Sequence, residues 1–180
     1  MRTLTLGMNV SLDGFVATPE DGLDWMFPNF SPELMADTHQ LLSGFGSILM
    51  GRVNYEGQAA TWPTAEGPLA DVMNGVEKVV FSTTLTTADW QNSRVCAEAP
   101  EVEVARLKAL DGPPLGASGG ATFARYLSSH DLVDEYRLTV HPVFLGSGKP
   151  IFAGRTPLEP VASTEYPNGV VVRTFRPRRG

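Results

Sequence analysis

The chain has 180 residues, 42% of them hydrophobic, which is enough to bury one core of ordinary domain size and argues against extensive disorder. Fourteen Lys and Arg against twenty Asp and Glu give a formal net charge of -6, which repels a nucleic-acid backbone over most of the surface. We therefore expect no nucleic-acid partner, and we interpret the basic residues 173–179 as a terminal strand and tail.

The single cysteine, Cys96, has no partner for an intrachain disulfide and cannot build a multi-cysteine zinc site. It follows a predicted strand, so we expect a buried, inert thiol. The three histidines lack metal-ligand spacing, and no metal site is predicted. No stretch resembles a secretion signal or a membrane span, so we expect a cytoplasmic protein without a membrane partner.

The first predicted elements are a strand and a helix. Residues 4–11 alternate in a way that is typical of a strand, and the Asp13-Gly14 pair that follows suits a turn. A helix is predicted from Pro32, because Ser31 is a suitable N-cap and the apolar residues after it keep helical spacing up to Phe45.

Strands and helices then alternate along the chain. The apolar run 47–50 is followed by Gly51 and by residues that can open a helix. The further predicted strands are 78–81 and 114–118, and the further predicted helices begin at Pro68, Pro100 and Ala121. Such alternation implies crossover connections and a mainly parallel sheet with helices on both faces.

The end of the chain shows a different pattern, with a strand in 134–146 and two strands in 161–175 joined at Asn168-Gly169, a strong hairpin signal. The predicted fold is therefore a three-layer α/β fold whose central sheet is mainly parallel with antiparallel C-terminal edge strands. No repeat or linker divides residues 1–180, so one domain is expected.

Three segments follow predicted parallel strands, at the sheet edge where ligands of such folds bind. They are Gly51-Arg52-Val53-Asn54, Ser82-Thr83-Thr84 and Ser118-Gly119-Gly120-Ala121-Thr122. Each also has an alternative structural explanation. Arg52 can pair with Glu56, the hydroxyl groups can cap backbone, and the two glycines can form a tight turn.

The common nucleotide motifs are absent. No G-x-G-x-x-G sequence follows a strand, and "GSGKP" (146–150) has proline where a phosphate-binding loop needs Ser or Thr. An ordinary dinucleotide-binding fold or an NTPase is therefore disfavoured.

The ordered segments "VSLDGFVA", "ILMGR", "VVFSTTL", "LGASGGATFARYL" and "LVDEYRLTVHPVFLGSGKPIF" resemble the dihydrofolate reductase superfamily. The closer resemblance is to the branch of the C-terminal reductase domain of the riboflavin-biosynthesis deaminase-reductase, and it covers nearly the whole chain. It implies a dihydrofolate-reductase-like fold, NADPH as cofactor, a small-molecule substrate and a homodimer, for which the long C-terminal strands offer an apolar face.

The resemblance also implies roles for individual residues. Arg52 offers a planar fork that suits a phosphate, including the 2′-phosphate that distinguishes NADPH from NADH. The implied cofactor-binding residues are Gly51, Arg52, Asn54, Ser82, Thr83, Gly119, Gly120, Ala121 and Thr122.

Asp13 is the implied catalytic residue, because "SLDG" lies beside the nicotinamide and substrate in such reductases and a carboxyl group there can orient the substrate or assist proton delivery. The alternative is a bend that the Asp13 side chain stabilises itself. Trp25 and Phe27 are predicted to stack on a flat substrate ring, and the alternative for both is a place in the core.

The predicted function is an NADPH-dependent reductase of a pyrimidine- or pteridine-like substrate, similar to the 5-amino-6-(5-phosphoribosylamino)uracil reductase of riboflavin biosynthesis. One alternative is a dihydrofolate reductase proper. Those enzymes place an acid on the first helix to bind the pterin, whereas Asp37 lies on the polar side of this helix, and they have Thr where Asn54 stands. The other alternative is a non-catalytic NADPH-binding protein.

Overall fold

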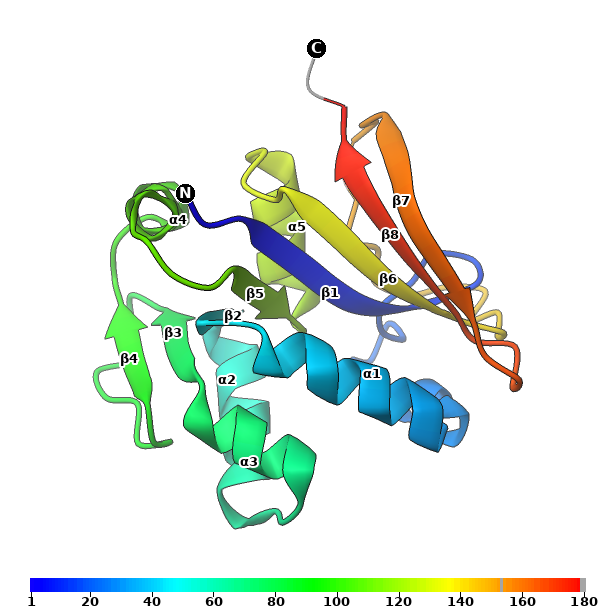
Figure 1. Cartoon of the computed structure of the whole chain (residues 1–180), viewed down its shortest axis with the longest axis horizontal. Helices are drawn as coiled ribbons and strands as arrows, with labels where there is room; N and C mark the ends of the chain where they lie inside the picture. Colours follow the sequence, from blue (N-terminus) through cyan, green and yellow to red (C-terminus); the bar gives the residue numbers. More distant parts are fainter. Residues whose placement is uncertain (153, 179–180) are drawn as a thin grey trace.

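The computed structural model describes residues 1–152 and 154–178, and in this part of the chain eight strands form one sheet in the order β4-β3-β2-β5-β1-β6-β8-β7 (Figure 1). The strands are β1 (Leu4–Ser11), β2 (Ser47–Gly51), β3 (Glu77–Phe81), β4 (Ser93–Cys96), β5 (Leu115–Ser118), β6 (Glu135–His141), β7 (Leu158–Glu165) and β8 (Val171–Pro177).

Helices connect most of the strands. The α-helices are α1 (Pro32–Ser43), α2 (Arg52–Ala59), α3 (Pro68–Gly75), α4 (Pro100–Ala109) and α5 (Ala121–Ser129), and the 3-10 helices are η1 (Asp24–Asn29) and η2 (Trp62–Thr64). None of the helices in the described ranges has the length and apolar character needed to cross a bilayer.

The sheet has the predicted mixed topology. The strands from β4 to β6 are parallel to their neighbours, whereas β8 pairs antiparallel with β6, and β7 pairs antiparallel with β8. The hairpin between β7 and β8 turns at Gly169, whose φ of 84° favours glycine. The α/β prediction, including its antiparallel C-terminal edge, is confirmed.

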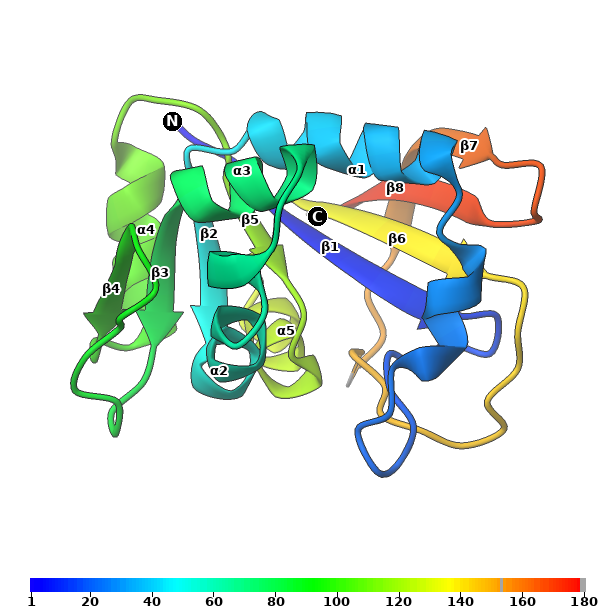
Figure 2. The ribbon, with the colours of Figure 1, turned by 90° about the horizontal axis from the view of Figure 1, so that it is seen from below.

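The helices form a layer on each side of the sheet (Figure 2). Helices α4 and α5 cover one face, where their buried residues join the apolar residues of β1 in one core cluster. Helices α1 and α3 lie on the opposite face. Along β1, Leu4, Leu6, Met8 and Val10 point into the cluster on the α5 side, so the residues between them point toward the face that α1 crosses.

Helix α1 begins as predicted, because the Ser31 hydroxyl accepts a hydrogen bond of 3.3 Å from the Leu34 N–H and Pro32 occupies the first turn. Residues 52–59 form helix α2 directly after β2, where the sequence has residues that can open a helix. Tyr55 anchors this helix with 4% of its surface exposed, and its hydroxyl accepts a hydrogen bond from the Trp90 N–H at 3.0 Å.

Leu127 provides a test of the packing of α5, because its side chain is fully buried in the cluster between α5 and the sheet. We expect Leu127→Ala to lower the free energy of unfolding by about 2–5 kcal/mol, since the truncation leaves a cavity beneath the helix. Urea denaturation measures this loss. The control Val102→Ala truncates a side chain that is 55% exposed, and a comparable loss in both variants would contradict the assignment of the core.

Candidate functional site

Three of the predicted ligand-binding segments meet at one edge of the sheet. They follow β2, β3 and β5, which are neighbouring parallel strands and therefore end at the same edge. Helix α2 begins directly after β2 at this edge, and α5 begins there after β5. The structure thus brings the predicted cofactor-binding residues together, whatever ligand they take.

Asn54 joins two of these segments. Its Nδ2 donates a hydrogen bond of 2.7 Å to the Ser118 carbonyl, and its Oδ1 accepts one of 3.1 Å from Gln58. Gly119 and Gly120 have φ angles of 70° and 71° and lie against Asn54 so closely that a Cβ on Gly120 would be 3.2 Å from the Asn54 Cβ. Both the backbone conformation and the space require glycine here.

Helix α5 packs against the ends of β2 and β3. A Cβ on Gly51 would lie 3.1 Å from the Phe123 Cβ, and the Phe123 ring stacks on Phe81 at a centroid distance of 5.1 Å. This packing sets the first turn of α5, with Ala121 and Thr122, next to the ends of β2 and β3. The first N–H groups of a helix have no partner within the helix, so this turn can donate hydrogen bonds to an anion.

Arg52 forms an ion pair with Glu56, which is the alternative structural explanation given for this residue. Its Nη1 lies 2.9 and 3.0 Å from the two carboxylate oxygens of Glu56, and both side chains are 45% exposed. An exposed pair of this kind contributes about 0.3–0.5 kcal/mol, so a phosphate can displace Glu56 at little cost. The pair holds the guanidinium at the start of α2 and leaves it able to exchange Glu56 for a phosphate.

The loop after β3 also matches its alternative structural explanation, in which a hydroxyl group caps backbone N–H groups. The Ser82 Oγ accepts hydrogen bonds from the N–H groups of Thr84 at 3.2 Å and of Leu85 at 2.9 Å, which fixes the turn. Thr83 is exposed at the tip. A ligand at this loop would therefore meet the Thr83 side chain and a rigid backbone.

Asp13 lies at the end of β1 and fastens a distant loop. Its carboxylate accepts hydrogen bonds from the Ser11 hydroxyl at 2.6 Å, from the Leu145 N–H at 3.2 Å and from the Gly146 N–H at 2.8 Å. The Ser11 hydroxyl, assisted by the two backbone donors, lowers the pKa of Asp13 below its usual value. Asp13 is thus a carboxylate near neutral pH, which suits an anchor or a hydrogen-bond acceptor and not a proton donor.

The predicted aromatic residues lie on η1 above the end of β6. Trp25 is half-buried and meets the His141 ring edge-on at a centroid distance of 5.4 Å, and Phe30 meets the same ring at 5.9 Å. Phe27 is 58% exposed and contacts only Phe30 among the ring contacts of the described chain. Trp25 therefore helps to cover His141, whereas Phe27 is available to a ligand.

His141 is a buried residue for which the sequence predicts neither a metal-binding role nor any other. It is fully buried, its Nε2 lies 2.9 Å from the Asn9 Oδ1, and its Nδ1 has no hydrogen-bond partner in the described chain. Burial lowers the pKa of His141 to about 4, so the ring is neutral. Asn9 and His141 add a polar pair at the ends of β1 and β6, beneath η1.

Asp37 does not reach this edge. It lies in the middle of α1, where it accepts a hydrogen bond from the Tyr166 hydroxyl after β7, and burial together with this carboxylate raises the pKa of Tyr166 to about 12. The first helix thus directs its acid to the β7–β8 hairpin.

Comparisons with known proteins find relatives of nearly the whole chain. The model of the RibD C-terminal domain matches residues 2–172. The protein named "Uncharacterized protein YyaP" of Bacillus subtilis (strain 168) is 32% identical over 178 residues, which cover 94% of this chain and 92% of that protein.

Two solved structures share the fold. A Shewanella sp. PV-4 protein, provisionally named for riboflavin biosynthesis, superimposes with a TM-score of 0.77 at 20% identity and covers 98% of this chain and 99% of its own. The Thermotoga maritima diaminohydroxyphosphoribosylaminopyrimidine deaminase/5-amino-6-(5-phosphoribosylamino)uracil reductase superimposes with a TM-score of 0.70 at 14% identity, and the match covers 98% of this chain and 57% of that protein.

The role of Asp13 as an anchor predicts a pH dependence. A carboxylate whose pKa is lowered by folding stabilises the fold above its unfolded pKa of about 3.9, and this contribution is lost as the pH falls through the folded pKa. We expect Asp13→Asn to be less stable than the parent protein at pH 7, and the difference to shrink below about pH 4. Urea unfolding at several pH values measures it. The control is Glu20→Gln at an exposed residue, and a difference for Asp13→Asn that stays constant with pH would contradict the prediction.

Proposed function

Since this chain belongs to the RibD C-terminal domain family, a family of reductase domains, we propose that it is an NADPH-dependent reductase of a pyrimidine- or pteridine-like compound. The observation that carries the proposal is the meeting of the three glycine- and hydroxyl-rich segments at one sheet edge, joined by the bond from Asn54 to Ser118. The name of the Thermotoga maritima protein includes a 5-amino-6-(5-phosphoribosylamino)uracil reductase, which is consistent with such a substrate.

The residues at this edge fit a dinucleotide phosphate. The left-handed backbone at Gly119 and Gly120 and the first turn of α5 offer N–H donors without side chains in the way. Arg52 offers the bidentate fork that a 2′-phosphate needs, after it exchanges Glu56 for the ligand. The bound cofactor would supply the reducing hydride, and the chain would supply the binding and the orientation.

The substrate would lie between the cofactor edge and η1. Phe27 presents an exposed ring for stacking, and Trp25 and Phe30 shield the neutral His141 below it. A flat, uncharged ring with amide-like groups suits these surroundings, because Asn9 and His141 at the ends of β1 and β6 form a neutral polar pair. Asp13 would hold the loop that contains Leu145 and Gly146 next to the substrate. It would not transfer a proton itself.

The two alternative functions make different demands on the site. A dihydrofolate reductase needs an acid from the first helix beside the pterin, whereas Asp37 is bonded to Tyr166. This observation favours the pyrimidine-type substrate. A non-catalytic protein would bind NADPH and leave it unoxidised with every substrate offered, dihydrofolate included.

The C-terminal hairpin is the surface on which we propose a second copy of the chain. Every residue of β7 after Leu158 is exposed, and Leu138, Val140 and Phe175 on the neighbouring strands are only partly buried although they pack against the core. An apolar, half-covered sheet face of this kind suits a homodimer. We expect sedimentation equilibrium to give twice the mass of the 19.4 kDa chain, and Val161→Asp to shift it toward the monomer. A monomeric parent protein would contradict the homodimer.

A titration with NADPH, NADH and FMN, followed by the fluorescence of the three tryptophans, tests the cofactor. We expect NADPH to bind more tightly than NADH, and Arg52→Ala to weaken NADPH by about tenfold or more, because a charge-assisted bidentate contact is lost. NADH should lose less. The matched control Arg173→Ala removes an exposed arginine from β8, far from the three loops. Equal NADPH affinity in Arg52→Ala and the parent protein would contradict the proposed contact.

A further inference from the structure

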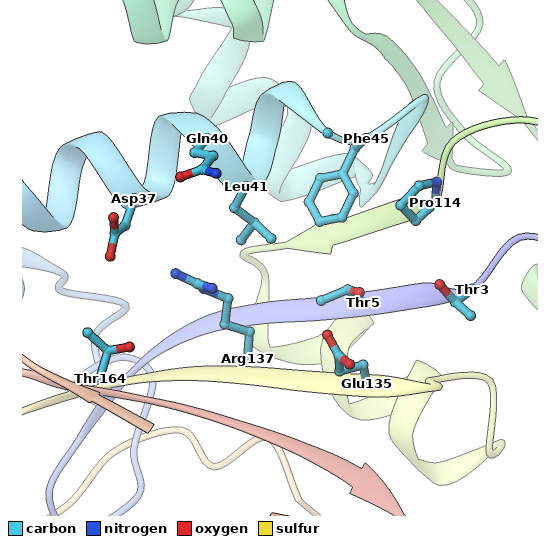
Figure 3. A pocket seen from close by; sticks show the side chains of 11 residues that line it. Thr3, Thr5, Asp37, Gln40, Leu41, Phe45, Pro114, Glu135, Arg137 and Thr164 are labelled. Atoms are coloured by element: carbon cyan, nitrogen blue, oxygen red, sulfur yellow. The ribbon is translucent and has the colours of Figure 1, made fainter. Parts of the chain in front are cut away.

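A polar cavity of about 520 Å³ lies at the opposite end of the strands from the three loops. It is open to solvent and is lined by the C-terminal half of α1 and by the first halves of β1 and β6 (Figure 3). The polar residues of its wall include Thr3, Thr5, Asp37, Gln40, Glu135 and Arg137. None of the residues assigned to the cofactor or substrate lines it.

The two acids of the cavity already have partners within the protein. Asp37 accepts the hydrogen bond from the Tyr166 hydroxyl, and Glu135 pairs with Arg176 on β8 at 3.2 Å. The arginine that balances Glu135 lies outside the cavity wall. Each acid is therefore held by a donor of the protein, although each carboxylate keeps one oxygen without a hydrogen bond in the described chain.

The donors of the cavity have no such partners. Arg137 is the one basic residue of the cavity wall, and its guanidinium makes no hydrogen bond or ion pair with the described residues. Figure 3 shows its side chain leaving β6 toward α1, below Asp37 and Leu41. The half-buried guanidinium carries five N–H donors, and none of its nitrogen atoms is both buried and unpartnered in the described chain, so these donors are open to water or to a ligand.

Hydroxyl and amide groups surround this guanidinium. The side chains of Thr3, Thr5 and Gln40, together with Thr164 from β7, also make no side-chain hydrogen bond in the described chain. Thr5 is only 6% exposed, and its hydroxyl, which is not among the buried unpartnered atoms of the described chain, remains accessible from the cavity. It can therefore bond to water or to a ligand that enters the cavity.

We propose that this cavity binds a small organic anion, one with a single carboxylate or phosphate group and neighbouring hydroxyl groups. The planar fork of Arg137 matches the two oxygens of such a group in a bidentate contact. The threonine hydroxyls and the Gln40 amide would bond the remaining hydroxyl groups. Asp37 and Glu135 disfavour a polyanion, because each added negative charge would be repelled within the same cavity.

The proposal is tested with three probes of nearly equal size: glycerol 3-phosphate, glycerate and uncharged glycerol. Isothermal titration calorimetry of the full chain measures each affinity. We expect one or both anions to bind and glycerol not to bind, and the comparison of the two anions decides between phosphate and carboxylate. Arg137→Gln should weaken the anion at least about tenfold, the loss expected for a charge-assisted contact.

Two further variants keep the test specific. Arg173→Gln removes the same charge from β8, but Arg173 pairs in register with Leu138 and so points to the other face of the sheet, where it should leave the affinity unchanged. Thr5→Val keeps the side-chain shape and removes the hydroxyl, and it should weaken the binding of the anion by a smaller factor. Circular dichroism and the thermal midpoint show whether each variant is folded.

Several outcomes would overturn the proposal. No binding of either anion to the folded parent protein would do so, as would equal anion affinity in Arg137→Gln and Arg173→Gln. A parent protein that binds no anion but loses its dimeric mass in Arg137→Gln would mean that a second copy covers the cavity. None of these results depends on NADPH, so the test is independent of the proposed reductase activity.

Discussion

The hydrogen bond from the Asn54 amide to the Ser118 carbonyl is the contact on which the candidate cofactor site depends. It ties α2, which begins at the end of β2, to the end of β5. Gly119 and Gly120 allow the tie, because any side chain there would collide with Asn54 and strain a left-handed backbone. This bond ties the turn before α5 to the start of α2, in addition to the packing of Phe123 against Gly51. With it, they form one rigid edge that presents Arg52 and the first N–H groups of α5 together.

A second set of bonds frames the other side of this edge. The segment after β6 is joined to the segment after β1 by backbone hydrogen bonds of 2.9 Å between Val16 and Lys149 and between Lys149 and Ala17. Asp13 adds its bonds to Leu145 and Gly146. The same carboxylate therefore cannot move to a substrate without releasing this loop. Its lowered pKa follows from the same donors, so the anchoring and the loss of acid character have one cause.

The sequence predicts most of the fold because the local signals are strong. The bounds of β1 and the N-cap at Ser31 are as predicted, since alternation and capping need only neighbouring residues. Lys78 shows where such reasoning fails. It lies in the predicted apolar strand and is fully buried, because its Nζ donates to the Met73 carbonyl at 2.9 Å and lies 4.3 Å from the centre of the Trp90 ring. These partners belong to other elements, and no local pattern reveals them.

The same division applies to the candidate sites. The strand-end loops are predictable because topology alone brings the ends of parallel strands together. The sequence does not predict a ligand-binding role for Arg137 or His141. These residues lie on one helix-covered face of the sheet only because β6 pairs with β1 beneath α1. A helix-covered sheet face is normally apolar, yet β1 places Thr5 and Asn9 on it. An apolar face would avoid the cost of covering polar groups, so this polar face makes physical sense where a ligand binds to it.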